Sequence, residues 1–181
     1  EASELPIILF PGSSRQLSAQ ADAVLFLSLL SGRNPQYLIG EQVISAPVIY
    51  NLGLEAIPTG YILLESGAKS SVQVMSNTNP LPTDKVDIIL AHALAGQYLG
   101  MKVIFLEMGS GSNQIIPGNV VSTLTSKLNI PVIVGGGVKN PEQAKNLIAA
   151  GANYIVVGNL LEKCHDIEVL NGITENIHSI Q

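Results

Sequence analysis

Two short glycine-rich segments near the C-terminal end constrain the fold of this chain most. Gly135-Gly136-Gly137 follows the apolar run Ile130–Val134, and Gly158-Asn159 follows the apolar run Asn153–Val157. One helix-sized segment, Asn140–Ala150, lies between them. Strand, glycine loop, helix, strand and glycine loop is the order of the last two units of a (β/α)8 barrel, where backbone N–H groups bind phosphate. We therefore expect a phosphate site at these two loops.

The rest of the chain alternates in the same way. Helical segments separate most of six apolar, strand-like runs, which predicts an α/β fold with a parallel sheet and a single domain spanning residues 1–181. A complete TIM-type barrel needs about 250 residues. We therefore interpret the chain as strands three to eight, with strands one and two absent from it. The expected strands are Leu5–Phe10, Ala23–Leu30, Gly60–Leu64, Lys102–Glu107, Ile130–Val134 and Asn153–Val157.

The connections between these runs differ in kind. Arg15–Gln20 is too short for a full crossover helix and predicts an irregular segment, and Met75–Pro82 predicts a loop. The dipeptides Asn34-Pro35 and Asn140-Pro141 each offer a helix N-cap followed by proline. Gly151 is a natural helix end.

Charge and composition exclude several classes of function. The net charge is −5 and no basic cluster is present, so nucleic-acid binding is not expected. The single cysteine, Cys164, leaves no internal disulfide and favours a cytoplasmic protein. Cys164 and His165 have no second ligand pair at zinc-binding spacing. No apolar run reaches the roughly 20 residues of a transmembrane helix, and any contact with a membrane surface would be transient.

Glu107 is the main catalytic candidate. It ends an apolar strand and precedes Gly109-Ser110-Gly111, so its partly desolvated carboxylate could take a proton from a substrate hydroxyl. The alternative is a carboxylate that caps the next segment or pairs with a lysine. Glu65 occupies the equivalent place on another strand. Cationic side chains that could meet anionic oxygens from nearby loops, or simply be solvated, are Arg15, Arg33, Lys69 and Lys139.

Three motifs carry a family resemblance. Phe105-Leu106-Glu107-Met108-Gly109-Ser110-Gly111 resembles Tyr-Leu-Glu-Ala-Gly-Ser-Gly of the geranylgeranylglyceryl phosphate synthase family, which includes bacterial heptaprenylglyceryl phosphate synthases. Gly135-Gly136-Gly137-Val138 and Val157-Gly158-Asn159 match its two glycine loops. Supporting matches, most similar to the Bacteroidetes-type form, are Ser31-Gly32-Arg33-Asn34-Pro35-x-Tyr37-Leu38-Ile39-Gly40, Pro58-Thr59-Gly60-Tyr61 and Met75-Ser76-Asn77-Thr78.

The resemblance implies a barrel whose third helix is replaced by irregular chain. It implies prenyl transfer from a polyprenyl diphosphate to the 3-hydroxyl of sn-glycerol 1-phosphate in membrane lipid biosynthesis, with Mg²⁺ on the diphosphate and a homo-oligomeric assembly, dimer or hexamer. Glu107 would be the base. The metal ligands would lie on the missing first two strands, and none is expected in this chain. The implied glycerol phosphate site comprises Phe105, Leu106, Glu107, Met108, Gly109, Ser110, Gly111, Gly136, Gly137, Gly158 and Asn159.

Two departures and two alternatives stand beside this interpretation. Phe105 replaces the family's tyrosine, which removes a phenol, and Met108 replaces its alanine. A different phosphate-binding barrel enzyme, an isomerase or aldolase, would need a strand-end lysine or a second acid–base partner, and no such lysine is found. A non-catalytic assembly subunit would not need Glu107 together with both glycine loops.

Overall fold

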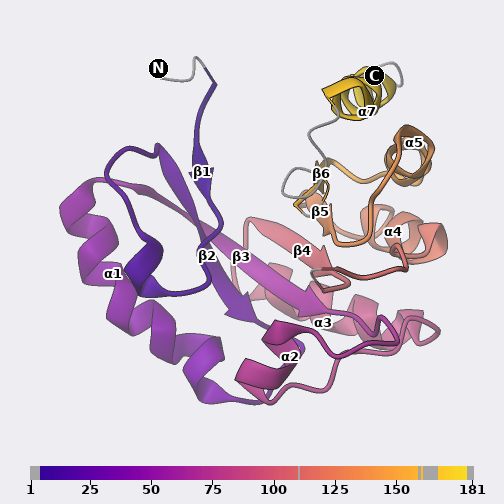
Figure 1. The fold of residues 1–181 in the computed structure, drawn as a ribbon. Helices are drawn as coiled ribbons and strands as arrows, with labels where there is room; N and C mark the ends of the chain where they lie inside the picture. Colours follow the sequence, from indigo (N-terminus) through magenta and orange to yellow (C-terminus); the bar gives the residue numbers. More distant parts are fainter. Residues whose placement is uncertain (1–4, 110, 159, 161–166, 179–181) are drawn as a thin grey trace.

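The chain folds into a curled sheet of six parallel strands with helices on its outer side (Figure 1). The computed structural model describes residues 5–109, 111–158, 160 and 167–178. Each strand pairs with the next one in the sequence, as in the progression around a barrel. The strands are β1 (Ile8–Leu9), β2 (Ala23–Leu29), β3 (Glu55–Leu63), β4 (Val103–Glu107), β5 (Val132–Gly135) and β6 (Tyr154–Val156).

All six expected strands are therefore present, but two of them differ clearly from the predicted bounds. The first spans only Ile8–Leu9 rather than Leu5–Phe10. β3 begins at Glu55 rather than Gly60, because its first residues pair with the start of β2 in register Ala23↔Glu55. Pro58 and Thr59 lie within this strand and made its sequence appear broken. The extra length lets β3 pair along the full length of β2, while its C-terminal half also pairs with β4.

The connections follow the expected irregularity with one correction. Between β1 and β2 lies only the short 3-10 turn η1 (Ser14–Gln16), as Arg15–Gln20 predicted. The predicted loop Met75–Pro82 is partly helical, because the Ser70 hydroxyl accepts a hydrogen bond from Gln73 N at 3.2 Å and starts a short helix. The helical segments after η1 are the π-helical η2 (Gln36–Gly40), α1 (Glu41–Leu52), α2 (Ser71–Ser76), α3 (Val86–Tyr98), α4 (Gly118–Thr125), α5 (Pro141–Ala149) and α7 (Ile167–His178).

The two faces of the sheet have different neighbours. On the outer face, Ile62, Ile104 and Val134 are fully buried in a core shared with α3, α4 and α5. On the inner face, Leu63, Phe105 and their neighbours form a second apolar cluster. Each fully buried large apolar side chain contributes about 1.5–3 kcal/mol. The strands are apolar on both faces, which explains their continuous hydrophobic runs.

Helix α5 fixes the spacing of the two glycine loops. The Asn140 side chain accepts a hydrogen bond from Gln143 N at 2.9 Å, and Pro141 follows as the first helical residue, as the sequence predicted. Gly151 follows the helix with φ of 105°, a conformation that favours glycine. In the described residues, no helix is long and apolar enough to cross a membrane.

Candidate functional site

Glu107 lies at the C-terminal end of β4, on the inner face of the sheet. Its neighbours across the strands are Leu63 on β3 and Gly135 on β5. Because the strands are parallel, the loops that follow them meet at the same edge. The Glu107 carboxylate therefore faces the loops after β5 and β6, where the sequence placed its glycines.

The Glu107 carboxylate is buried and retains one strong backbone contact. Its side chain is 8% exposed, and its Oε1 accepts a hydrogen bond from Gly109 N at 2.7 Å. Burial raises its pKa from 4.5 to about 6, and the Gly109 hydrogen bond opposes that rise. A carboxylate with this pKa is ionised at neutral pH, and it binds a proton more readily than an ordinary glutamate does. These are the properties of a general base.

Glycines after β5 make room for that carboxylate. A Cβ at Gly136 would lie 2.8 Å from Glu107 Oε1, and one at Gly135 would lie 2.9 Å from Oε2. At Gly137 a Cβ would overlap the backbone carbonyl of Gln114. Gly136 and Gly137 also have φ of 90° and 78°. Both space and backbone conformation therefore require glycine in this loop.

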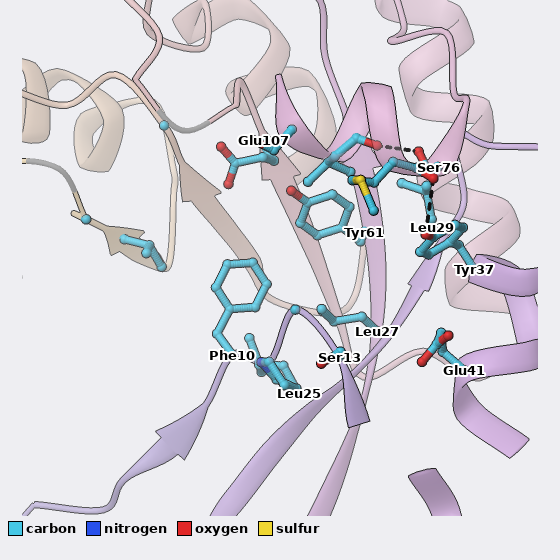
Figure 2. Close-up of a pocket in the computed structure, with 18 of the residues that line it drawn as sticks. Phe10, Ser13, Leu25, Leu27, Leu29, Tyr37, Glu41, Tyr61, Ser76 and Glu107 are labelled. Carbon is cyan, nitrogen blue, oxygen red and sulfur yellow. Dashed lines mark hydrogen bonds between the residues drawn. The ribbon is translucent and has the colours of Figure 1, made fainter. Parts of the chain in front are cut away.

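Three aromatic rings cluster on the inner face near Glu107, and Figure 2 labels two of them, Phe10 and Tyr61. Phe105 is fully buried, and its ring stacks on Phe10 with centroids 4.8 Å apart and on Tyr61 with centroids 5.5 Å apart. Burial raises the pKa of the Tyr61 phenol above its usual value, and the negative charge of Glu107 raises it further. The phenol therefore stays protonated at neutral pH.

A cavity of about 1000 Å³ opens from this point along the inner face. One end is bounded by Glu107 and the loops after β4, β5 and β6, and the remainder is walled by β2, the segment around η1, α1 and α2. At the polar end, Lys139 Nζ donates a hydrogen bond to Asn113 Oδ1 at 2.8 Å. The apolar lining includes Phe10, Leu17, Leu25, Leu27, Leu29, Ile49, Val72 and Met75.

The structure gathers part of the predicted glycerol phosphate site around this cavity. Gly111, Gly136, Gly137 and Gly158 line it together with Glu107, and Gly109 contacts the Glu107 carboxylate. Ser110 and Asn159 lie outside the described residues.

Three other residues of the predicted site are buried in the sheet. Phe105 lies beneath the cavity, stacked on two rings that line it. The side chains of Leu106 and Met108 are buried in the core of the outer face, because alternate residues of a strand point to opposite faces. Neither side chain reaches the cavity.

The other charged candidates lie in different places. Lys139 lines the cavity, whereas Glu65 and Lys69 are exposed and outside its lining. Arg33 donates hydrogen bonds to the carbonyl groups of Leu30 and Gly32 and contacts His92 Nε2 at 3.2 Å. Arg33 therefore ties its own loop to α3 and does not face the cavity. Sequence reasoning missed Phe10 and Tyr61, whose rings approach Glu107 only through the pairing of different strands.

Known proteins with similar sequences and folds include members of one family. The sequence profile of the PcrB family matches residues 1–176. A geranylgeranylglyceryl phosphate synthase of Chitinophaga pinensis is 46% identical over 176 residues, which cover 97% of this chain and 69% of that protein. The chain spans about two thirds of the length of the curated relatives that it matches.

Two solved structures resemble the fold closely. One is (S)-3-O-geranylgeranylglyceryl phosphate synthase from Thermoplasma acidophilum in complex with its substrate sn-glycerol-1-phosphate. It is similar with a TM-score of 0.91 and 39% identity, covering 97% of this chain and 70% of that one. The other is the wild-type GGGPS from Thermoplasma volcanium, with a TM-score of 0.91 and 38% identity over 99% of this chain and 72% of that one.

Proposed function

We propose, since this chain belongs to the PcrB family, that it is a prenyltransferase acting in membrane lipid biosynthesis. The reaction forms an ether between a polyprenyl diphosphate and the 3-hydroxyl of sn-glycerol 1-phosphate. The observation that carries the proposal is the position of Glu107. Its buried carboxylate lies where the glycine loops after β5 and β6 meet the apolar cavity.

Glu107 acts as the general base on the glycerol hydroxyl. As the oxygen attacks the allylic carbon, the new C–O bond forms and the bond from that carbon to the diphosphate breaks. The diphosphate leaves with the electron pair, and the hydroxyl proton passes to Glu107. A carboxylate whose pKa is about 6 is ionised before the reaction and can accept this proton at neutral pH.

The polar end of the cavity suits the phosphate of glycerol phosphate. Gly136, Gly137 and Gly158 leave backbone there without side chains in the way. Lys139 adds a cationic group at the same end. The apolar remainder of the cavity suits a prenyl chain, because burying its methylene groups is favourable.

Mg²⁺ would neutralise the departing diphosphate. Within the described residues, no three His, Cys, Asp or Glu side chains come together. We expect the metal ligands on two further strands, by the resemblance to the synthase family.

Those two strands would also complete the barrel. In the described chain, β1 pairs only with β2 and β6 only with β5, so both ends of the curl are open edges. Apolar side chains lie at these edges, since Ile7, Ile8 and Tyr154 are 43%, 50% and 60% exposed. Two more strands between β6 and β1 would cover them within one (β/α)8 domain, which assembles as a dimer or hexamer.

The test is to incubate the full-length natural protein with sn-glycerol 1-phosphate, Mg²⁺ and prenyl diphosphates of increasing length. Mass spectrometry should detect a prenyl ether of glycerol phosphate with at least one donor. The enantiomer, sn-glycerol 3-phosphate, serves as the matched control and should react poorly. Absence of ether with every donor would refute the proposed function.

A further inference from the structure

Tyr61 and Glu107 are diagonal neighbours on the inner face of the sheet. Tyr61 on β3 pairs with Phe105 on β4, and Glu107 follows two residues later on the same face. Diagonal positions of this kind are close enough for long side chains to approach each other. Figure 2 shows the Tyr61 hydroxyl pointing from β3 toward the Glu107 carboxylate.

The Tyr61 residue lines the cavity, and its hydroxyl has no hydrogen-bond partner among the described residues. The side chain is 6% exposed. The rings of Phe10 and Phe105 both pack near the Tyr61 ring, with centroids 6.1 Å and 5.5 Å away, and so restrict its orientation. A ligand that fills the cavity displaces water from this hydroxyl, so a ligand group that accepts its hydrogen bond would bind better there than one that cannot.

The two functional groups are complementary but not bonded to each other. The buried phenol stays protonated and has a hydrogen to donate, whereas the ionised Glu107 carboxylate can only accept. Glu107 Oε1 already accepts the hydrogen bond from Gly109 N. An alcohol oxygen can satisfy both groups at once, because it donates through its own hydrogen and accepts on a lone pair.

On this basis, and resting on the proposed function, we propose that the Tyr61 hydroxyl donates a hydrogen bond to the glycerol oxygen that attacks the prenyl donor. Glu107 receives the proton of that same hydroxyl group. The oxygen is thus held between Tyr61 and Glu107, with one lone pair left to attack the allylic carbon. Tyr61 orients the nucleophile in the ground state and stabilises the negative charge that develops on it as the O–H bond breaks.

The test compares Tyr61→Phe with wild type in the full-length protein. Tyr98→Phe, on an exposed tyrosine at the end of α3, is the matched control because it removes a phenol that is 79% exposed. Two ligands separate the effect of the hydroxyl from that of the phosphate. They are sn-glycerol 1-phosphate and propane-1,2-diol 1-phosphate, which lacks the 3-hydroxyl. Calorimetry gives the ratio of their affinities, and single-turnover assays give the rate of ether formation.

Wild type and Tyr98→Phe should bind sn-glycerol 1-phosphate more tightly than propane-1,2-diol 1-phosphate. Tyr61→Phe should reduce that preference by about 3- to 10-fold, the range expected for one hydrogen bond. The Tyr61→Phe variant should bind propane-1,2-diol 1-phosphate as wild type does, and it should form ether at least about tenfold more slowly.

If Tyr61→Phe keeps both the preference and the rate of wild type, the role of Tyr61 is refuted and the proposed function stands. If wild type neither prefers the 3-hydroxyl nor forms ether, both proposals fail together. An equal loss of affinity for both ligands would also overturn the role, because it would mean a general disturbance of the site.

Discussion

Replacing Glu107 by Gln should make the fold more stable at neutral pH while it removes the catalytic base. Burial raises the pKa of Glu107 from 4.5 to about 6, so the folded protein disfavours the ionised form. A difference of about 1.5 units at 1.36 kcal/mol each corresponds to about 2 kcal/mol. The free-energy cost of burying the ionised carboxylate is therefore complete above about pH 6. It disappears below pH 4.5, the pKa of this glutamate in the unfolded chain.

The side-chain amide that Glu107→Gln introduces can still accept the hydrogen bond from Gly109 N through its oxygen, so the variant keeps the main backbone contact of the carboxylate. Urea unfolding at pH 7 should show a gain of up to about 2 kcal/mol for Glu107→Gln. In thermal unfolding this corresponds to a Tm about 4–8 °C higher. At pH 4.5 the gain should be small.

Glu65→Gln is the matched control. Glu65 is exposed at the end of the neighbouring strand, and its replacement should change the stability by less than about 0.5 kcal/mol. If Glu107→Gln were no more stable than wild type at pH 7, or if its gain were the same at both pH values, the proposed cost of the buried charge would be wrong.

Two further predictions concern the base and the glycine loops. With Glu107 as the base, kcat/KM should fall about tenfold per pH unit below about pH 6, because the protonated carboxyl cannot accept the hydroxyl proton. A rate independent of pH between 5 and 8 would contradict this role. Gly137→Ala should lower the unfolding free energy by about 1–3 kcal/mol from its φ of 78° alone, and by more from overlap with the Gln114 carbonyl. Gly158→Ala, where a Cβ would meet open space, should unfold like wild type but bind glycerol phosphate more weakly; equal stability of the two variants would refute the steric argument.

Much of the fold could be predicted because apolar runs that end in glycine or polar residues mark buried parallel strands. The C-terminal ends of parallel strands share one edge of the sheet, and this general rule predicted that Glu107 would lie near the loops at Gly135–Gly137 and Gly158. Helix α2 was missed because its start depends on a single serine cap at Ser70 rather than on a periodic apolar pattern.

The finer composition of the site depends on strand register, which the sequence does not contain. Tyr61 lies beside Phe105 only because β3 and β4 pair at those positions. The motif around Glu107 suggested a continuous row of lining residues. Alternation along β4 instead directs Leu106 to the outer core while Phe105 and Glu107 face inward. That part could have been foreseen from the period of a strand.

The central claim is that Glu107 removes the proton from bound glycerol phosphate, and single-turnover ether formation by Glu107→Gln tests it most directly. The full-length variant would be mixed with saturating sn-glycerol 1-phosphate, Mg²⁺ and a prenyl donor that wild type accepts. Calorimetry on the same samples would give the affinity for sn-glycerol 1-phosphate. We predict an affinity within about tenfold of wild type and a rate of ether formation lower by at least about 100-fold. A variant that binds glycerol phosphate and forms ether at the wild-type rate would contradict the claim.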